Sequence, residues 1–391
     1  MPTWQTPSRL LRNYLTMPNR SALRLLSQCL AGALDQPLDI KDLPANEAEW
    51  QRVLQLSSTH FVTPLLRWAL QEKSLMSALP SEIVEYLDAF HALNLDDNRL
   101  YEDQLAHLIQ VLNQVGVRPV LLKGAATLVG SLYPSIAERF IGDIDILIPS
   151  SKLPEIINQL RAAGYTPGDV DDFPSAEDFA GQATHHCSPV RSMDWPVWVE
   201  LHLHPVHLNV SRLLSSEEMI QDATPLNWRG GECLIPSPTH FVMHNVIHAF
   251  LVDYDSKAFL SLRQLFEFVY ACRNYAGQID WTAIQQRFDG CHAGAKLRCY
   301  MALANIYLGF QAPAELPIGE WSRLRARFHC AWVDAPVAIY FPIRLFGLAG
   351  SGLKNRLRNL KRNPRNLKKL LSSGIYVNFY RELCTFKKRT F

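Results

Sequence analysis

Apolar side chains recur at helical spacing through the first third of the chain. They fall every three or four residues, as in Trp50, Val53 and Leu54, and the longest such pattern covers residues 81–114. A period near 3.6 is typical of helices that bury one face. The spacing therefore predicts an α-helical N-terminal region over residues 1–115.

The hydrophobic period changes at about residue 116. Short apolar runs suited to buried strands alternate from here with helical segments: strands over 119–122, 140–148 and 197–203, helices over 124–133 and 151–163, and a polar loop over 166–189. Strands that alternate with helices indicate an α/β sheet unit. We expect residues 116–235 to form a small mixed sheet.

Helical spacing returns after the turn Pro236-Ser237-Pro238. It covers 239–252, 257–275, 282–288 and 297–308. These segments predict a C-terminal helical domain over residues 236–330, followed by an apolar segment and a basic tail over 331–391. The expected fold class is α+β, with a small mixed sheet flanked by N- and C-terminal helical domains.

Two carboxylates interrupt the second predicted strand. Asp143 and Asp145 stand at i and i+2 in Gly-Asp-Ile-Asp-Ile-Leu-Ile, so both side chains point to one face. Two like charges side by side repel, and Mg²⁺ is the usual cation that offsets such a pair. An Asp-x-Asp pair alone is common, and by itself it favours a solvent-facing edge strand.

The third predicted strand carries a further acid. In Trp-Val-Glu-Leu-His, Glu200 and His202 share one face. A sheet that sets Glu200 beside Asp143 and Asp145 builds a three-carboxylate cup for one or two metal ions in phosphoryl transfer. We expect the two aspartates to be metal ligands and Glu200 to be the third ligand or the catalytic base.

Candidate phosphate-binding residues precede these acids. Lys123 and Gly124 stand at a strand-to-helix turn, where glycine lets the backbone approach a phosphate and the lysine adds positive charge. Arg139 lies four residues before Asp143 and is placed to meet a triphosphate or to balance the acids. Lys123 could also be an ordinary charge at a strand end.

These residues carry a resemblance to a known family. The run VLLKGAATLVGSLYPSIAERFIGDIDILI, the later VELH, and the segments THFVTPLLRWAL, THFVMHNVIHAF and QIDW resemble the uncharacterised nucleotidyltransferase family of the DNA polymerase β-like superfamily. The resemblance covers residues 45–313. It implies a nucleotidyltransferase fold in which Asp143, Asp145 and Glu200 bind Mg²⁺, or Mn²⁺ in its place, and an NTP whose α-phosphate is attacked.

Histidines and one further arginine are candidates for substrate contact. His202 shares the face of Glu200, and His248 lies one helical turn after His244, with Arg263 on the next predicted helix. Two histidines at i and i+4 are a spacing that metal sites use, but the glutamate of a zinc protease is missing here. Hydrogen-bonded core histidines explain the same pattern.

Charge is distributed unevenly along the chain. Residues 351–391 contain twelve Lys/Arg and one acid, a local charge of +11, whereas the other 350 residues contain 27 basic against 36 acidic side chains. The tail interleaves leucines with cations, which suits an anionic membrane surface, RNA phosphates, or packing on the acidic body.

Three further features argue against a secretory signal, against a disulfide framework or zinc site, and against a membrane span. The first 30 residues lack an apolar core and a cleavage site, the eight cysteines are scattered without a CxxC pair, and prolines break the longest apolar stretch, 335–350. We expect a cytoplasmic protein with reduced thiols, peripheral to a membrane at most.

The sequence thus favours a Mg²⁺-dependent nucleotidyltransferase that moves an NMP group from an NTP to an acceptor and releases pyrophosphate. The acceptor could be a small molecule, a glycan, a protein or RNA. The alternative is a catalytically idle nucleotide-binding protein with a regulatory or membrane-associated scaffold role.

Overall fold

The computed structural model describes residues 22–167, 185–187, 189–195, 197–254 and 260–333. Residues 20–327 form one compact unit, and residues 1–19 with 328–391 form a second. Apart from the end of one helix, the apolar segment and basic tail predicted over 331–391 lie outside the described residues.

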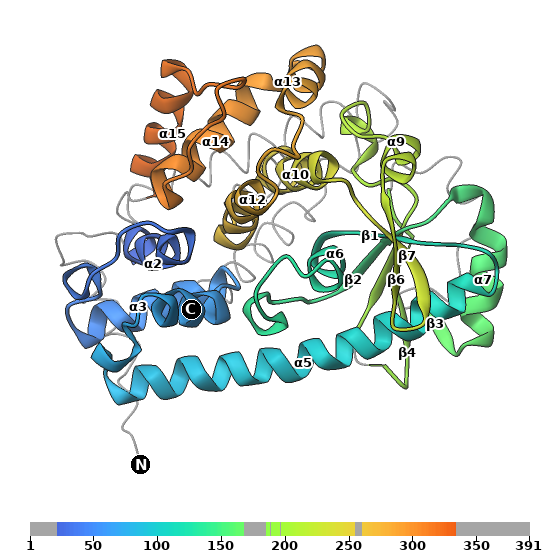
Figure 1. Cartoon of the computed structure of the whole chain (residues 1–391), viewed down its shortest axis with the longest axis horizontal. Helices are drawn as coiled ribbons and strands as arrows, with labels where there is room; N and C mark the ends of the chain where they lie inside the picture. The colour runs from blue at the N-terminus through green and yellow to red at the C-terminus, as the bar shows by residue number, and fades with distance from the viewer. Residues whose placement is uncertain (1–21, 168–184, 188, 196, 255–259, 334–391) are drawn as a thin grey trace, which may run out of the picture. The chain divides into compact units, whose positions relative to one another are not determined.

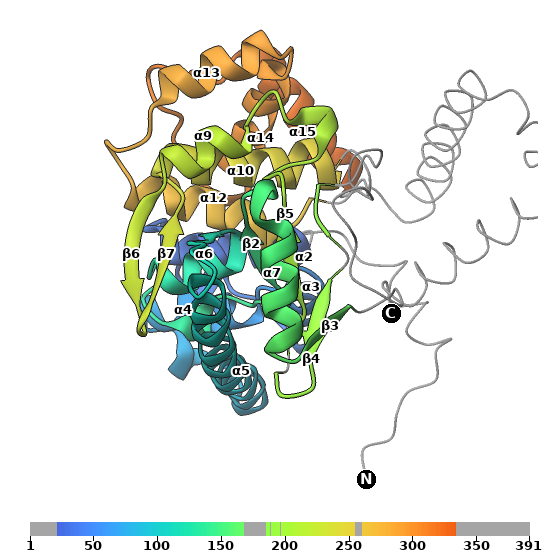
Figure 2. The ribbon, with the colours of Figure 1, turned by 90° about the vertical axis from the view of Figure 1, so that its right-hand side faces the viewer.

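Seven strands form one mixed sheet in the order β3-β4-β5-β2-β1-β7-β6. The strands are β1 (Val120–Leu121), β2 (Ile144–Leu147), β3 (Tyr165–Pro167), β4 (Val190–Ser192), β5 (Val199–His202), β6 (Thr224–Trp228) and β7 (Gly231–Ile235). Figure 2 shows the hairpin β6–β7 and the pair β3–β4 at opposite edges of this sheet. The strands β2 and β5, which carry or adjoin the predicted acids, therefore lie in its interior.

Strand β2 has one antiparallel and one parallel neighbour. It pairs antiparallel with β1 and parallel with β5, while β1 pairs parallel with β7. All four residues of β2 are buried, although one of them is Asp145. A continuous buried run is typical of an interior strand, so this carboxylate needs partners.

The helices before the sheet form a layer that leads into it. They are α2 (Ala22–Ala31), α3 (Glu47–Thr59), α4 (Thr63–Glu72) and α5 (Ser81–Asn113), with short 3₁₀ turns η1 (Gly32–Leu34), η2 (Ile40–Asp42) and η3 (Met76–Ala78). Helix α5 buries Leu105, Leu108, Ile109 and Leu112 at the spacing of one helical face. In Figure 1 this helix runs from α3 and α4 to the strands and α7.

Helices within and after the sheet complete the described unit. They are α6 (Lys123–Val129), η4 (Ile136–Glu138), η5 (Ser150–Lys152), α7 (Leu153–Ala162), η6 (Leu208–Val210), α9 (Ser216–Gln221), α10 (Pro238–Val246), the π-helix η7 (Ile247–Tyr254), α12 (Leu262–Asn274), α13 (Trp281–Gly290), α14 (Gly294–Leu308) and α15 (Glu320–Val333). Helix α12 packs against α10 and α14, as Figure 1 shows. Among the helices of the described ranges, none combines the length and the apolar character that crossing a membrane requires.

The predicted mixed sheet among helices is confirmed in outline. The strands are shorter than predicted, and Asp143 lies in a bend just before β2 rather than inside it. Strands β3, β4, β6 and β7 were not predicted. The division into domains at residues 115, 235 and 330, with helical domains that flank the sheet, stays a prediction.

Candidate active site

Two carboxylates face each other across the parallel pair β2 and β5. Asp145 and Glu200 are register partners, so their side chains emerge on the same face of the sheet. His202, two residues after Glu200, shares that face. The side chain of Asp145 is buried and that of Glu200 is partly exposed. The sheet register therefore brings together two of the three predicted acids.

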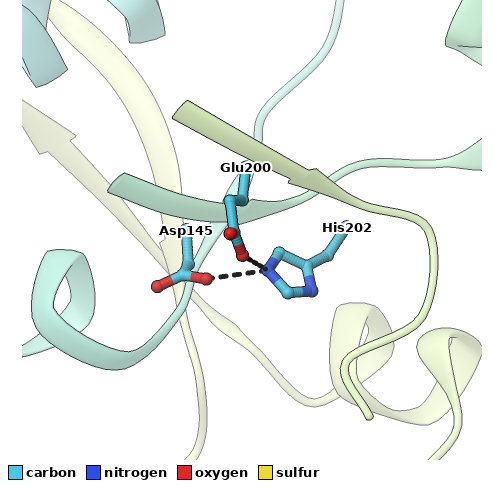
Figure 3. Close-up of side chains that lie close together, drawn as sticks. All are labelled: Asp145, Glu200 and His202. Atoms are coloured by element: carbon cyan, nitrogen blue, oxygen red, sulfur yellow. Dashed lines mark hydrogen bonds and ion pairs between the residues drawn. The ribbon is translucent and has the colours of Figure 1, made fainter. Parts of the chain in front are cut away.

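Hydrogen bonds and ion pairs join these groups, as Figure 3 shows for Asp145, Glu200 and His202. The Nε2 atom of His202 lies 2.8 Å from Oδ1 of Asp145 and 3.5 Å from Oε2 of Glu200. The Nζ atom of Lys123 donates to the same Oδ1 at 2.6 Å. The other oxygen of Asp145, Oδ2, is buried and has no hydrogen-bond partner among the residues that the structure describes.

The pKa values of this cluster follow from burial and from the neighbouring charges. Burial raises the pKa of the Asp145 carboxyl, but the Lys123 ammonium and the His202 imidazole together hold it well below its usual range. The hydrogen bond from His202 likewise lowers the pKa of Glu200. Burial lowers the pKa of His202, yet its bonds to both carboxylates raise it above its ordinary value. Both acids are ionised at neutral pH.

Lys123 reaches Asp145 from an unusual backbone conformation. It begins α6 with φ +45°, in the left-handed region that non-glycine residues rarely adopt. Burial lowers the pKa of its ammonium, but Asp145, with Asp143 and Glu200, raises it. Gly124 beside it is buried, and a Cβ there would meet the Ile141 side chain at 3.1 Å. This glycine is needed for packing, and its predicted phosphate contact stays a prediction.

Asp143 stands next to this cluster but makes no direct bond in it. It is half-buried in the bend before β2. Burial and the charge of Asp145 raise the pKa of its carboxyl, and Lys123 and Arg139 act in the opposite direction. The Asp143 carboxylate is thus held near other acids at a cost in free energy.

The donor set fits a divalent cation. Asp145, Glu200 and His202 each offer one ligand atom, and these atoms lie within 4.8 Å of one another. With Asp143 nearby, three carboxylates outnumber the two cationic groups, the Lys123 ammonium and the His202 imidazole with its raised pKa, and Oδ2 of Asp145 has no partner among the described residues. Carboxylate oxygens suit Mg²⁺ and Mn²⁺, whereas an imidazole ligand suits softer ions.

Comparison with protein families agrees with this geometry. The model of a family described as uncharacterised nucleotidyltransferase matches residues 46–309, more than half of the chain. The chain belongs to this nucleotidyltransferase family. A comparison with curated proteins finds no match, and neither does a comparison with solved structures. The predicted family is therefore confirmed, and the matched range contains every predicted site residue of this nucleotidyltransferase-family chain.

Arg139 lies in a buried network instead of at an open site. Its Nε donates to Oε2 of Glu267 on α12 at 2.6 Å, and both side chains are 5% exposed. It also donates to the backbone oxygen of Phe140. Asn245 donates to the second oxygen of Glu267 at 3.4 Å, and Tyr300 donates to Asn245 at 3.1 Å. The predicted nucleotide contact of Arg139 stays a prediction.

His248 and Arg263 lie at the side of the cluster where α12 begins. Nδ1 of His248, in the π-helix, is 3.2 Å from Oδ2 of Asp253, and Gln264 donates to the same carboxylate oxygen. Burial lowers the pKa of His248, and the charge of Lys123 lowers it further. The predicted substrate contact of His248 stays a prediction.

Arg263 differs from Arg139 in its partners. It is half-buried, and its Nε is buried and has no hydrogen-bond partner within the described part of the chain. Burial, and then repulsion by Arg139, lower the pKa of its guanidinium to about 10. A buried guanidinium nitrogen that lacks an acceptor is suited to receive an anion.

Sequence reasoning missed that His185 and His186 lie beside His202 and His207. The ring of His185 lies 5.3 Å from that of His202 and 3.8 Å from that of His207, and His186 lies 5.4 Å from His202. Burial, followed by His202, lowers the pKa of His185 to about 2. The His-His pair falls in a stretch expected to be loop, so only its bridge to β5 places it here.

Proposed function

We propose that this chain is a divalent-metal-dependent nucleotidyltransferase that transfers an NMP group from an NTP to a hydroxyl acceptor. The observation that carries the proposal is the register of Asp145 opposite Glu200, with one buried Asp145 oxygen that has no partner in the described ranges. Membership of the nucleotidyltransferase family supports it. In the reaction the acceptor oxygen bonds to the α-phosphorus, the bond to the β-phosphate breaks, and pyrophosphate leaves.

Asp143, Asp145 and Glu200 would hold the cation, which is Mg²⁺ or Mn²⁺ according to their oxygen ligands. When bound, such an ion neutralises charge that develops on the transferred phosphoryl group. His202 is a positioning residue, because its Nε2 lies between Asp145 and Glu200 and fixes the two carboxylates relative to each other.

The remaining residues bind the triphosphate and move a proton. Arg263 has a guanidinium nitrogen for which the described residues offer no acceptor, and Lys123 can exchange Asp145 for a phosphate oxygen because its side chain is 22% exposed. Glu200 is partly exposed and is ionised at neutral pH, so it accepts the proton of the acceptor hydroxyl. Arg139 is held in its buried ion pair with Glu267.

The acceptor is defined by one chemical group, a hydroxyl that can attack the α-phosphorus. A small molecule, a glycan, a protein or RNA each presents the required hydroxyl. The basic tail would add affinity for RNA or for an anionic membrane at which a cytoplasmic enzyme meets its acceptor.

The test is transfer from labelled ATP, GTP, CTP and UTP in cell extract, with Mg²⁺ or Mn²⁺, followed by identification of the labelled product. Asp143→Asn should lower transfer at least about a thousandfold, because it removes several kcal/mol of charge stabilisation and each 1.4 kcal/mol is tenfold in rate. Asp96→Asn, which changes an exposed aspartate on α5, is the matched control and should transfer normally.

Two outcomes distinguish an active nucleotidyltransferase from an idle nucleotide-binding protein. Full activity of Asp143→Asn would refute the assignment of the acids. Binding of an NTP in calorimetry without any labelled product would support the idle nucleotide-binding protein instead.

A further inference from the structure

An aromatic stack borders the candidate active site. The rings of Phe61 and Phe140 lie 4.9 Å apart between centroids, with an interplanar angle of 19°. Phe61 is 48% exposed, although it is a large apolar residue. A ring that is covered on one face and exposed on the other offers a π surface to a ligand.

The backbone of Phe61 favours a different residue. Helix α3 ends in a Schellman turn, in which the N–H of Phe61 bonds to the oxygen of Ser58 and the N–H of Val62 bonds to that of Ser57. Phe61 holds the left-handed position of this turn, with φ +55°. Glycine is the usual residue there, because a Cβ is strained in that conformation. The turn does not require the ring, so the ring calls for another explanation.

Phe140 connects the stack to the acidic bend. Its ring lies 3.7 Å from the point where a Cβ on Gly142 would stand. Asp143 is the next residue along the chain. The covered side of the stack therefore lies against the backbone that presents one of the candidate metal ligands.

His60 connects the same stack to Arg263. The backbone N–H of Leu262, at the start of α12, donates to Nδ1 of the buried His60 at 3.2 Å. Phe61 follows His60 in the chain, and Arg263 follows Leu262. One hydrogen bond thus joins the chain segment that carries the exposed ring to the start of α12, where Arg263 has an Nε without a partner among the described residues.

From these contacts we propose that Phe61 and Phe140 form the platform on which the nucleobase of the NTP stacks. The inference rests on the proposed function, because a triphosphate that reaches Arg263 and the acids sets its base near the stack. Stacking on an aromatic ring is tolerant of base identity and increases with ring area, so purine nucleotides should bind more tightly than pyrimidine nucleotides.

The test measures binding of ATP and of inorganic tripolyphosphate, each with Mg²⁺, to the full chain by calorimetry. Phe61→Gly removes the ring and suits the turn, so the melting temperature should stay the same or rise. Its affinity for ATP should fall roughly tenfold to a hundredfold, the range that loss of one base stack gives. Its affinity for tripolyphosphate should not change, since this probe lacks a base.

Further variants serve as controls. Phe61→Tyr keeps a ring and should bind ATP like the wild type. Trp321→Ala removes another exposed aromatic side chain, on α15, and should also leave ATP binding unchanged.

Three results would overturn the proposal. Unchanged ATP affinity in Phe61→Gly excludes stacking on this ring. An equal loss of ATP and tripolyphosphate affinity assigns the ring to the fold instead of the base. A wild-type chain that binds none of the four NTPs refutes the proposed function and this inference together, whereas the first two results leave the proposed function standing.

Discussion

Two charged clusters of this protein differ in how far their charges and hydrogen-bonding atoms are paired. In the network of α10, α12 and α14, Arg139 and Glu267 form a buried ion pair, and Asn245 and Tyr300 extend it by hydrogen bonds. On the sheet, Asp145 and Glu200 share His202, Lys123 pairs with Asp145 alone, and one Asp145 oxygen has no partner among the described residues.

The difference separates a structural role from a functional one. In a buried pair of opposite charges whose polar atoms are hydrogen-bonded, no atom is left to bind a ligand. A cluster with surplus negative charge and an orphaned oxygen can bind one. Arg263 resembles the cluster on the sheet but carries a positive charge, because its Nε is buried and has no acceptor among the described residues.

The largest effect on stability should come from breaking the network. Arg139→Met leaves Glu267 buried without its cation, so the free energy of unfolding should fall by about 3–5 kcal/mol. Denaturant unfolding measures this change. The double variant Arg139→Met with Glu267→Gln removes the stranded charge and should recover much of the loss, because the amide still bonds to Asn245.

A different result for Arg139→Met would remove the distinction between a structural and a functional cluster. If Arg139→Met unfolded like the wild type but no longer bound ATP, Arg139 would belong to the nucleotide site, as its sequence position indicated.

A smaller effect should appear on acidification at His60, which holds the start of α12. Burial lowers the pKa of His60 from 6.5 to about 4. Because the folded state disfavours its protonation, the stability that His60 contributes is complete above about pH 6.5 and is lost as the pH falls toward 4. Between pH 8 and pH 5 this loss is about 2 kcal/mol.

His60→Asn isolates this contribution. The asparagine oxygen can accept the bond from Leu262 but does not titrate in this range. The difference in the free energy of unfolding between the two chains should therefore change by about 2 kcal/mol from pH 8 to pH 5. A constant difference would show that His60 is not held neutral by burial.

The smallest expected effect is a gain in stability, and it concerns the acid Asp143. Burial and Asp145 raise the pKa of Asp143, so its charge opposes folding. Asp143→Asn should increase the free energy of unfolding by about 0.5–1 kcal/mol although it abolishes transfer. A loss of stability would mean that Asp143 is a structural residue, and the contrast between the two clusters would weaken.

The sequence predicted the acids because their signal is local. A period of two placed Asp145 and Glu200 on strand faces, and one parallel register then made them neighbours. His202 followed from the same period. These inferences need only a few residues of context and the pairing of two strands.

Other features depend on residues far apart in the chain. Arg139 meets Glu267, 128 residues later, and nothing near either residue in sequence indicates that pair. The missed hairpin β6–β7 did have a local sequence signal, the adjacent Gly230 and Gly231. In the structure Arg229 and Gly230 both have positive φ, as a two-residue hairpin turn of this kind requires. The proline and asparagine in β6 concealed it, because both are uncommon in strands.

The pairing of β2 with β5 has a consequence for how folding of this protein should be measured. A slip of one residue between the two strands would set Leu201 or Val199 opposite Asp145 and turn Glu200 to the other face. The backbone of such a sheet would remain hydrogen-bonded, and far-ultraviolet circular dichroism would score it as native. Binding of a divalent cation, which needs both carboxylates on one face, would tell the two sheets apart.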